Sequence, residues 1–308
     1  MKQIKFLILI SILCLLFCCK NDIKDETKTI EANISSTSIS KCPKHILDQK
    51  ENNLNISILL DLSDRIEKTK VRQKDSAYLS SLSKSFVEHI KHKKLILLED
   101  RMQLFFNPEP SDEKINEIAE KLEAVFTKET SKTKITETLS LYTNTPSELY
   151  DLAKHDAESS GGYPGSDIWR FFKDNIKDYS IDECHRNILV ILTDGYMFYD
   201  KTIMNEKNRT SYLTPKSLRK LQLNKANWKD EMEKKDLGFI QANSGLHDLE
   251  VLVIGITSHN DENPYTLDVI EAYWAKWFDE MGVKKYKIKK ADISSSIEKV
   301  ITNFVLKT

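Results

Sequence analysis

Three apolar segments of strand length recur along the chain, and each is followed directly by polar or glycine-containing sequence. They are residues 56–60 (ISILL), 188–193 (ILVILT) and 249–256 (LEVLVIGI). A segment that is apolar on both of its alternating faces is typical of a strand in a parallel sheet that helices cover on both sides. We therefore expect these three segments to form the centre of one buried sheet.

The sequence between these strands carries apolar residues at helical spacing. In residues 70–92, for example, Tyr78, Leu82, Phe86 and Ile90 fall on one face of a helix. The alternation of strand and helix predicts an α/β fold with a doubly wound, mostly parallel sheet flanked by helices. Further strands are expected at 101–106 and 286–288, and further helices at 111–126, 134–142, 146–159, 167–176, 215–241, 264–281 and 293–305.

Aromatic residues gather in two parts of the chain that we interpret differently. The loop from Tyr196 to Thr214 follows the second strand, and it either contacts a partner or packs onto the domain as a small subdomain. The sequence leaves both alternatives open. In the helix expected at 264–281, by contrast, we expect Trp274 and Trp277 to belong to the core.

The first 19 residues differ from everything that follows. Lys2 and Lys5 precede an apolar run at 6–17 that is shorter than a typical membrane-spanning helix, and Cys18 and Cys19 close it. This segment, 1–19, resembles a bacterial lipoprotein signal peptide, in which a cysteine becomes the lipidated first residue. The resemblance implies lipidation of Cys19, or of Cys18, and a lipid anchor in a membrane of the bacterial cell envelope, with the domain periplasmic or surface-exposed. The alternative is an uncleaved N-terminal anchor.

Residues 20–50 are expected to form a flexible tether. Residues 20–40 are polar and show no apolar periodicity, so they cannot bury enough surface to offset the entropy of ordering the chain. Residues 51–308 suit one large α/β domain. The whole chain has 47 acidic and 46 basic residues, and this balance does not indicate a nucleic-acid partner.

Two cysteines, Cys42 and Cys184, lie outside the signal segment. Cys42 precedes the first strand and Cys184 lies four residues before the strand at Ile188. If these strands are neighbours in a parallel sheet, both cysteines lie near its amino edge. Disulfides persist in exported proteins, so we expect a Cys42–Cys184 bridge, with two unpaired thiols as the alternative.

Oxygen-bearing side chains follow two of the strands. Asp61 and Ser63 come after the first strand, Asp194 comes after the second, and Ser166 lies in a glycine-containing loop just before a helix. In open α/β sheets, ligands bind in the crevice outside the carboxyl ends of the strands. We therefore expect these four side chains to meet at one edge of the sheet.

These residues resemble the von Willebrand factor A (vWA) family. Its metal-ion-dependent adhesion site combines a D-x-S-x-S motif, a loop threonine and an aspartate in a T-D-G-like turn. Residues 61–65 (DLSDR) match the first two ligands, Ser166 replaces the threonine, and residues 193–195 (TDG) supply the last. The resemblance covers residues 52–306 by element order and implies a vWA, or Rossmann-like, fold. The family usually carries a small antiparallel edge strand between the positions of 127 and 161; none is evident here, and we expect helices in its place.

The resemblance also implies a site for Mg²⁺, or alternatively Mn²⁺ or Ca²⁺. A hard divalent cation accepts hydroxyl and carboxylate oxygens and keeps several waters. Few direct carboxylates leave the ion electrophilic, which favours an acidic group of a partner as the final ligand. The expected ligands are Asp61, Ser63, Ser166 and Asp194.

Arg65 is the departure from the family pattern, because it stands where the family has a second metal-binding serine. An arginine is always charged and cannot ligate a cation. Either its guanidinium turns into the pocket, pairs with Asp61 or Asp194 and occupies the position of the cation, or it points outward and Asp64 compensates. Asp167, next to Ser166, is a further candidate modifier of the site.

Three functions remain open. The first is a protein-binding module for adhesion or assembly, as the vWA resemblance implies. The second is a metal-dependent hydrolase or phosphatase with Asp61 as nucleophile, and the third is a structural factor of the envelope with a vestigial site. The chain lacks G-x-S-x-G, Walker-type, H-E-x-x-H and C-x-x-C motifs. No histidine is expected in the site loops, since His155 lies in a helical stretch and His185 at the far end of its strand. We therefore expect a binding protein and not an enzyme.

Overall fold

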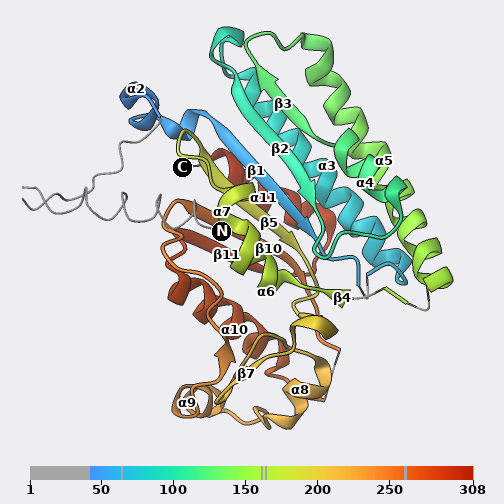
Figure 1. Ribbon diagram of the computed structural model, residues 1–308, viewed down its shortest axis with the longest axis vertical. Coiled ribbons are helices and arrows are strands. Elements are labelled where there is room, and N and C mark those ends of the chain that lie inside the picture. The colour runs from blue at the N-terminus through green and yellow to red at the C-terminus, as the bar shows by residue number, and fades with distance from the viewer. Residues whose placement is uncertain (1–41, 64, 161, 164, 260–261, 308) are drawn as a thin grey trace, which may run out of the picture. The chain divides into compact units, whose positions relative to one another are not determined.

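The computed structural model describes residues 42–307 apart from 64, 161, 164, 260 and 261. The expected signal segment, its Cys18 and Cys19, and most of the expected tether lie outside the described residues. At the centre is a six-stranded sheet with the order β11-β10-β5-β1-β2-β3, parallel except for β3 (Figure 1). The predicted α/β class with a mostly parallel central sheet is confirmed. Its strands are β1 (Leu54–Leu60), β2 (Glu99–Phe105), β3 (Ala124–Thr127), β5 (Arg186–Leu192), β10 (Leu249–Ile256) and β11 (Lys285–Lys290).

Helices cover both faces of this sheet, as Figure 1 shows. The side chains of β1 alternate between two hydrophobic clusters: Ile58 and Leu60 join the cluster under α3, α4, α5 and α11, and Leu59 joins the cluster under α6, α9 and α10. This is the doubly wound arrangement that strands apolar on both faces require. The helices are α2 (Lys44–Leu47), α3 (Thr69–Lys91), α4 (Glu113–Lys121), α5 (Lys132–Ser160), α6 (Ile168–Arg170), α7 (Ile176–Ser180), α8 (Pro215–Lys220), α9 (Trp228–Lys234), α10 (Thr266–Met281) and α11 (Ser294–Leu306).

The edge strand β3 corrects our expectation for residues 111–126. The helix ends at Lys121, and Ala124–Thr127 pairs antiparallel with β2. Ala124 and Phe126 are buried and Val125 and Thr127 exposed, which is the two-residue period of a strand. The expected helix was too long because Leu122, Val125 and Phe126 continue the apolar spacing of α4. The sheet therefore has an antiparallel edge strand, but it lies ahead of the segment between 127 and 161, where we expected helices and where the structure has α5.

Two other helices differ from their predictions. The segments expected at 134–142 and 146–159 form one helix, α5, with Pro146 inside it. The single helix expected at 215–241 is instead two short helices, α8 and α9. The polar sequence of this segment carries good helix-forming residues, but local propensity is a weak guide to where a helix stops.

The aromatic loop packs onto the domain as a small subdomain. Tyr196 and Met197 are buried, while Phe198 is 41% exposed. The loop contributes to two small sheets. One pairs β4 (Gly165–Ser166) with β6 (Phe198–Tyr199); the other contains β7 (Asn205–Glu206), β8 (Arg209–Thr210) and β9 (Gly238–Phe239).

The predicted Cys42–Cys184 disulfide is confirmed, with 5.3 Å between the Cα atoms. Cys42 precedes β1 and Cys184 precedes β5, and these two strands are parallel neighbours. The bridge therefore fastens the chain at the amino edge of the sheet. The last residues of the expected tether are ordered here, because α2 and a 3₁₀ turn, η1 (Lys50–Asn52), lead from Cys42 into β1. Among the described residues, no helix is both long and apolar enough to cross a bilayer.

Reducing the Cys42–Cys184 bridge is expected to lower the free energy of unfolding by about 2–5 kcal/mol, because the bond closes a loop spanning 142 positions in the unfolded chain. Urea unfolding followed by tryptophan fluorescence, with and without reductant, measures the change. A Cys42→Ser/Cys184→Ser variant is the control, since reductant should not alter its midpoint. Equal stability of the oxidised and reduced wild type contradicts this prediction.

Candidate functional site

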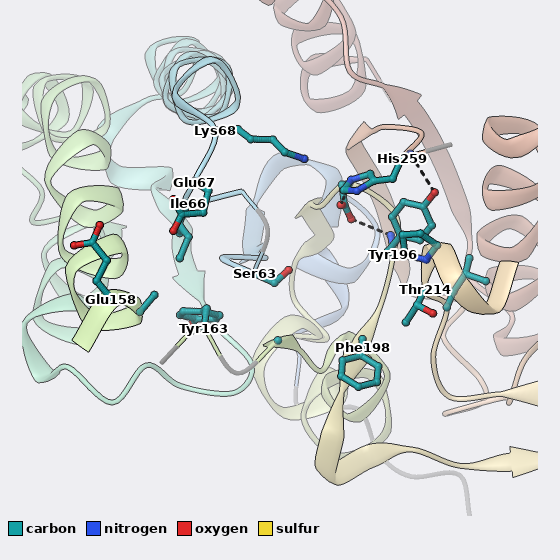
Figure 2. A pocket seen from close by; sticks show the side chains of 16 residues that line it. Ser63, Ile66, Glu67, Lys68, Glu158, Tyr163, Tyr196, Phe198, Thr214 and His259 are labelled. Atoms are coloured by element: carbon teal, nitrogen blue, oxygen red, sulfur yellow. Dashed lines mark hydrogen bonds and ion pairs between the residues drawn. The ribbon is translucent and has the colours of Figure 1, made fainter. Parts of the chain in front are cut away.

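A cleft of about 670 Å³ opens at the carboxyl edge of the central sheet (Figure 2). Ser63 and Lys68 line it from the segment between β1 and α3, and Tyr163 lines it from the segment after α5. Asp194 closes the opposite side, together with His259, which follows β10. The cleft is thus assembled from loops that follow three central strands and one helix.

Asp61 follows β1 directly and connects the loops at this edge. It is 1% exposed. Its Oδ1 accepts hydrogen bonds from Ser63 N at 3.0 Å and from Ser63 Oγ at 2.5 Å. Its Oδ2 accepts one from Thr193 Oγ1 at 2.8 Å. Asp61 therefore links the loop after β1 to the end of β5.

The ionisation of Asp61 is strongly perturbed. Burial, together with the negative charge of Asp194, raises the pKa of Asp61 from 3.8 to about 6. The hydrogen bonds from Ser63 and the positive charge of Arg65 lower this pKa, but they offset only part of the rise. Two neighbouring carboxylates at this edge thus resist being charged together.

Asp194 lies at the mouth of the cleft and is 7% exposed. Its Oδ1 accepts a hydrogen bond from Tyr196 N at 3.0 Å, and its Oδ2 lies 2.9 Å from Nε2 of His259. Nε2 of His259 makes no hydrogen bond with the described residues, so this is a close approach of a basic and an acidic group and not a hydrogen bond. The ring of Tyr196 packs edge-on against His259, with 5.0 Å between centroids.

Arg65 adopts neither of the two arrangements that we expected. Its guanidinium turns into the domain and donates to both carboxylate oxygens of Asp75 on α3, with Nε 2.9 Å from Oδ2. The hydroxyl of Tyr150 on α5 donates to the same Oδ2 at 2.7 Å. Arg65 is 4% exposed and Asp75 is fully buried. Gly255 lies against the guanidinium, and a Cβ there would be 2.9 Å from Nη2, so a larger residue would displace the arginine.

The loop before α6 holds the remaining predicted residues. Ser166 is 6% exposed and follows Gly165, which lines the cleft; in β4 it pairs with Phe198 of β6. Asp167 has a structural role: its carboxylate accepts hydrogen bonds from Arg170 N at 3.0 Å and from the hydroxyl of Thr202. It caps α6 and fastens the aromatic loop. Asp64 lies outside the described residues.

His259 corrects our expectation that the site holds no histidine. It follows the third buried strand, β10, whose carboxyl end lies at the same edge as those of β1 and β5. The rule that selected Asp61 and Asp194 therefore also selects His259, but we had considered only His155 and His185. In Figure 2 the amine of Lys68 extends toward His259.

The donors present are suited to a hard divalent cation. Ser63 and Asp194 line the cleft and offer a hydroxyl and a carboxylate. Asp61 lies beneath Ser63, outside the lining, and Ser166 lies one residue from it. Within the described part of the chain, no group of three or more His, Cys, Asp or Glu converges on one point. A cation here would therefore depend on serine hydroxyls and water for its other ligands.

Asp61→Asn is expected to change the pH dependence of stability. Because the folded-state pKa is raised, the native state binds a proton between about pH 4 and 6 that the unfolded state has lost, so Asp61 lowers stability as pH rises through this window. In EDTA, the free energy of unfolding of the variant should exceed that of the wild type by about 3 kcal/mol at pH 7. At pH 4 the two values should be nearly equal. Urea unfolding across pH 4–8 measures this, with the exposed Asp230→Asn as control. A pH-independent difference contradicts the prediction.

Asp75→Ala is expected to lower the free energy of unfolding by about 3–5 kcal/mol, because it leaves the buried Arg65 guanidinium without a counter-charge. The matched control also joins α3 to α5: Arg72 contacts Asp151 at 2.7 Å, but Asp151 is 69% exposed. Asp151→Ala should therefore cost less than about 1 kcal/mol. Thermal and urea unfolding compare the two. If the two substitutions lower the free energy of unfolding by similar amounts, the buried pair of Arg65 and Asp75 stabilises the fold no more than the exposed pair.

The comparisons with known proteins give one remote likeness. No family model and no curated protein matches the chain. Among solved structures, the chain is similar to a pilus adhesin, SpaC from Lactobacillus rhamnosus GG, with 11% sequence identity and a TM-score of 0.37. The likeness covers 82% of this chain and 30% of the adhesin, so the chain spans less than a third of that protein's length.

Proposed function

We propose that this protein is a binding module that takes an acidic side chain of a protein partner into the cleft, through a divalent cation held beside Asp61 and Asp194. Mg²⁺ is the preferred ion, with Mn²⁺ and Ca²⁺ as alternatives. Ser63 would contribute its hydroxyl, as would Ser166 after a small movement of its loop. The bound cation would supply Lewis acidity toward a carboxylate, and the chain's own residues would orient it.

The pairing of Arg65 with Asp75 carries this proposal. A guanidinium between Asp61 and Asp194 would neutralise the carboxylates and leave no need for a cation. Instead, the guanidinium is engaged by Asp75, whose Oδ2 also accepts a hydrogen bond from the Tyr150 hydroxyl. Asp61 forms no salt bridge with a described basic residue, and its pKa is raised in part by Asp194. A divalent cation would relieve the repulsion between these two acids.

The cleft also supplies surfaces that suit a protein ligand. Tyr163 and Phe198 line it, and Lys68 lies at its rim (Figure 2). Aromatic side chains bring large contact area at a low cost in side-chain entropy, and a lysine attracts acidic groups. The recognised group is therefore expected to be an acidic residue beside an apolar one.

The vWA kinship and the envelope location are parts of the same proposal. The strand order and the antiparallel β3 support the kinship, since the family usually carries such an edge strand. Lipidation of Cys19, or of Cys18, would hold the domain at a membrane of the bacterial cell envelope.

A metal-dependent hydrolase is the alternative, and His259 adds an imidazole that the sequence argument had not counted. Asp61 is poorly placed as its nucleophile, because it is 1% exposed and both of its carboxylate oxygens accept hydrogen bonds. Turnover of a generic phosphoester that is lost in His259→Ala would favour the enzyme. Absence of both turnover and metal binding would favour an envelope factor with a vestigial site.

Mn²⁺ titration tests the binding proposal, with calorimetry for affinity and water-proton relaxation for the coordination of the ion. We expect Asp61→Asn and Asp194→Asn to weaken Mn²⁺ binding at least tenfold, because each removes a negative charge beside the ion. Added acetate should displace bound water in the wild type, and acetamide should not.

The matched control is Asp167→Asn, since Asp167 lies next to Ser166 but is turned to the cap of α6 and to Thr202. It should keep wild-type Mn²⁺ affinity, and circular dichroism verifies that each variant is folded. Wild-type protein that binds no Mn²⁺, or an Asp61→Asn variant that binds it normally, removes the cation from the proposed mechanism.

A further inference from the structure

Three consecutive aliphatic side chains project from the domain in the turn between α3 and β2. They form a 3₁₀ turn, η2 (Leu95–Leu97), and are 40%, 74% and 61% exposed in chain order. The next residue, Leu98, is buried. The described residues contain no other run of three exposed aliphatic side chains. A tip of this kind is unfavourable in water unless something covers it.

Basic residues flank this tip. Lys91 and Lys94 are exposed, and residues 91–98 contain no acid. Lys93 is engaged at the base of the turn, where its Nζ lies 2.6 Å from Oδ2 of Asp100. The tip therefore combines free positive charge with aliphatic side chains, which is the composition of segments that enter the interface of an anionic membrane.

The tip lies at the edge where the chain enters the domain. Lys93 Nζ donates to Asn53 Oδ1 at 3.1 Å, and Nε2 of His89 lies 3.0 Å from the carbonyl oxygen of Asn52. These contacts join the end of α3 to η1, the turn through which the chain passes from Cys42 into β1. In Figure 1 the turn between α3 and β2 lies at the same end of the strands as α2. The cleft lies at the opposite edge.

We propose that Leu95–Leu97, with Lys91 and Lys94, form a membrane-docking tip that seats the amino edge of the domain on an anionic lipid surface and presents the cleft away from it. The sequence before Cys42 holds the apolar run 6–17, so the amino edge is the part of the domain nearest any N-terminal anchor along the chain. The effective concentration of lipid at the tip is then high, and weak insertion suffices to fix the orientation. The inference shares with the proposed function only the expectation of an N-terminal membrane anchor.

Co-sedimentation with vesicles tests the proposal. All six strands of the central sheet and both hydrophobic clusters lie within residues 42–307, so a chain that begins at Ser40 holds the complete folded unit without the apolar run. In EDTA, this chain should bind vesicles of phosphatidylcholine with 30% phosphatidylglycerol. Ile96→Ser/Leu97→Ser should lower its partition coefficient about tenfold or more. Lys91→Gln/Lys94→Gln should weaken binding to the anionic vesicles and reduce its salt dependence.

The matched control is Ile293→Ser, because Ile293 is 63% exposed but follows β11, at the carboxyl edge. It should leave vesicle binding unchanged, as should Asp61→Asn, which separates this proposal from the cation in the cleft.

Insertion of the tip is measured with Ile96→Trp. Brominated lipid should quench the fluorescence of the new side chain, whereas the four native tryptophans are buried. Wild-type chain that stays in the supernatant, or a serine double variant that sediments like wild type, would overturn the proposal. So would a dimer that the same substitutions dissociate, since the tip would then bind a second copy.

Discussion

The parallel pairing of β1 with β5 sets the positions of Asp61 and Asp194 relative to each other. Leu60 is the register partner of Leu192, so Asp61 follows directly beside Thr193, and the hydroxyl of Thr193 donates to it. Asp194 then comes next on the same edge. A shift of one residue in this pairing would turn one of the acids toward the opposite face, because successive strand residues alternate in direction. The two apolar strands therefore determine the chemistry of the edge as well as the core.

Two buried acids near this edge are stabilised in different ways. Asp75 meets the Arg65 guanidinium and the Tyr150 hydroxyl, so its charge is compensated within the domain. Asp61 is buried and lies near another acid, and its pKa is raised to about 6 because the hydrogen bonds from Ser63 and the charge of Arg65 offset these two effects only in part. Arg65 thus completes an internal ion pair between the loop after β1 and α3, and the charge imbalance at the cleft remains unresolved. Sites of binding or catalysis are often where such imbalance persists.

Much of this arrangement could be read from the sequence, and the failures have physical reasons. Strands buried on both faces are recognisable as continuous apolar runs. Because the carboxyl ends of parallel strands lie at one edge of the sheet, Asp61 and Asp194 were expected there. The strand β3 was missed because its four residues continue the helical spacing of α4, so periodicity alone could not separate them. His259 was overlooked although the same rule applies to the end of β10. The partner of Arg65 could not be predicted, because Asp75 lies nearly two turns inside α3 and the choice depends on how α3 and α5 pack against the loop.

The two edges of the sheet also differ in what they require of the sequence. At the carboxyl edge, loops converge and bring together polar groups that are far apart in the chain, which is why ligand sites of α/β folds lie there. At the amino edge, the chain enters and the Cys42–Cys184 bridge fastens it. The turn at Leu95–Leu97 there exposes aliphatic side chains that none of the described elements covers. An exposed aliphatic turn does nothing for a ligand site at the opposite edge, and it carries a solubility cost. This exposure beside the entry of the chain is explained if the amino edge meets an apolar surface. A domain held on a membrane by this edge presents its cleft away from the membrane.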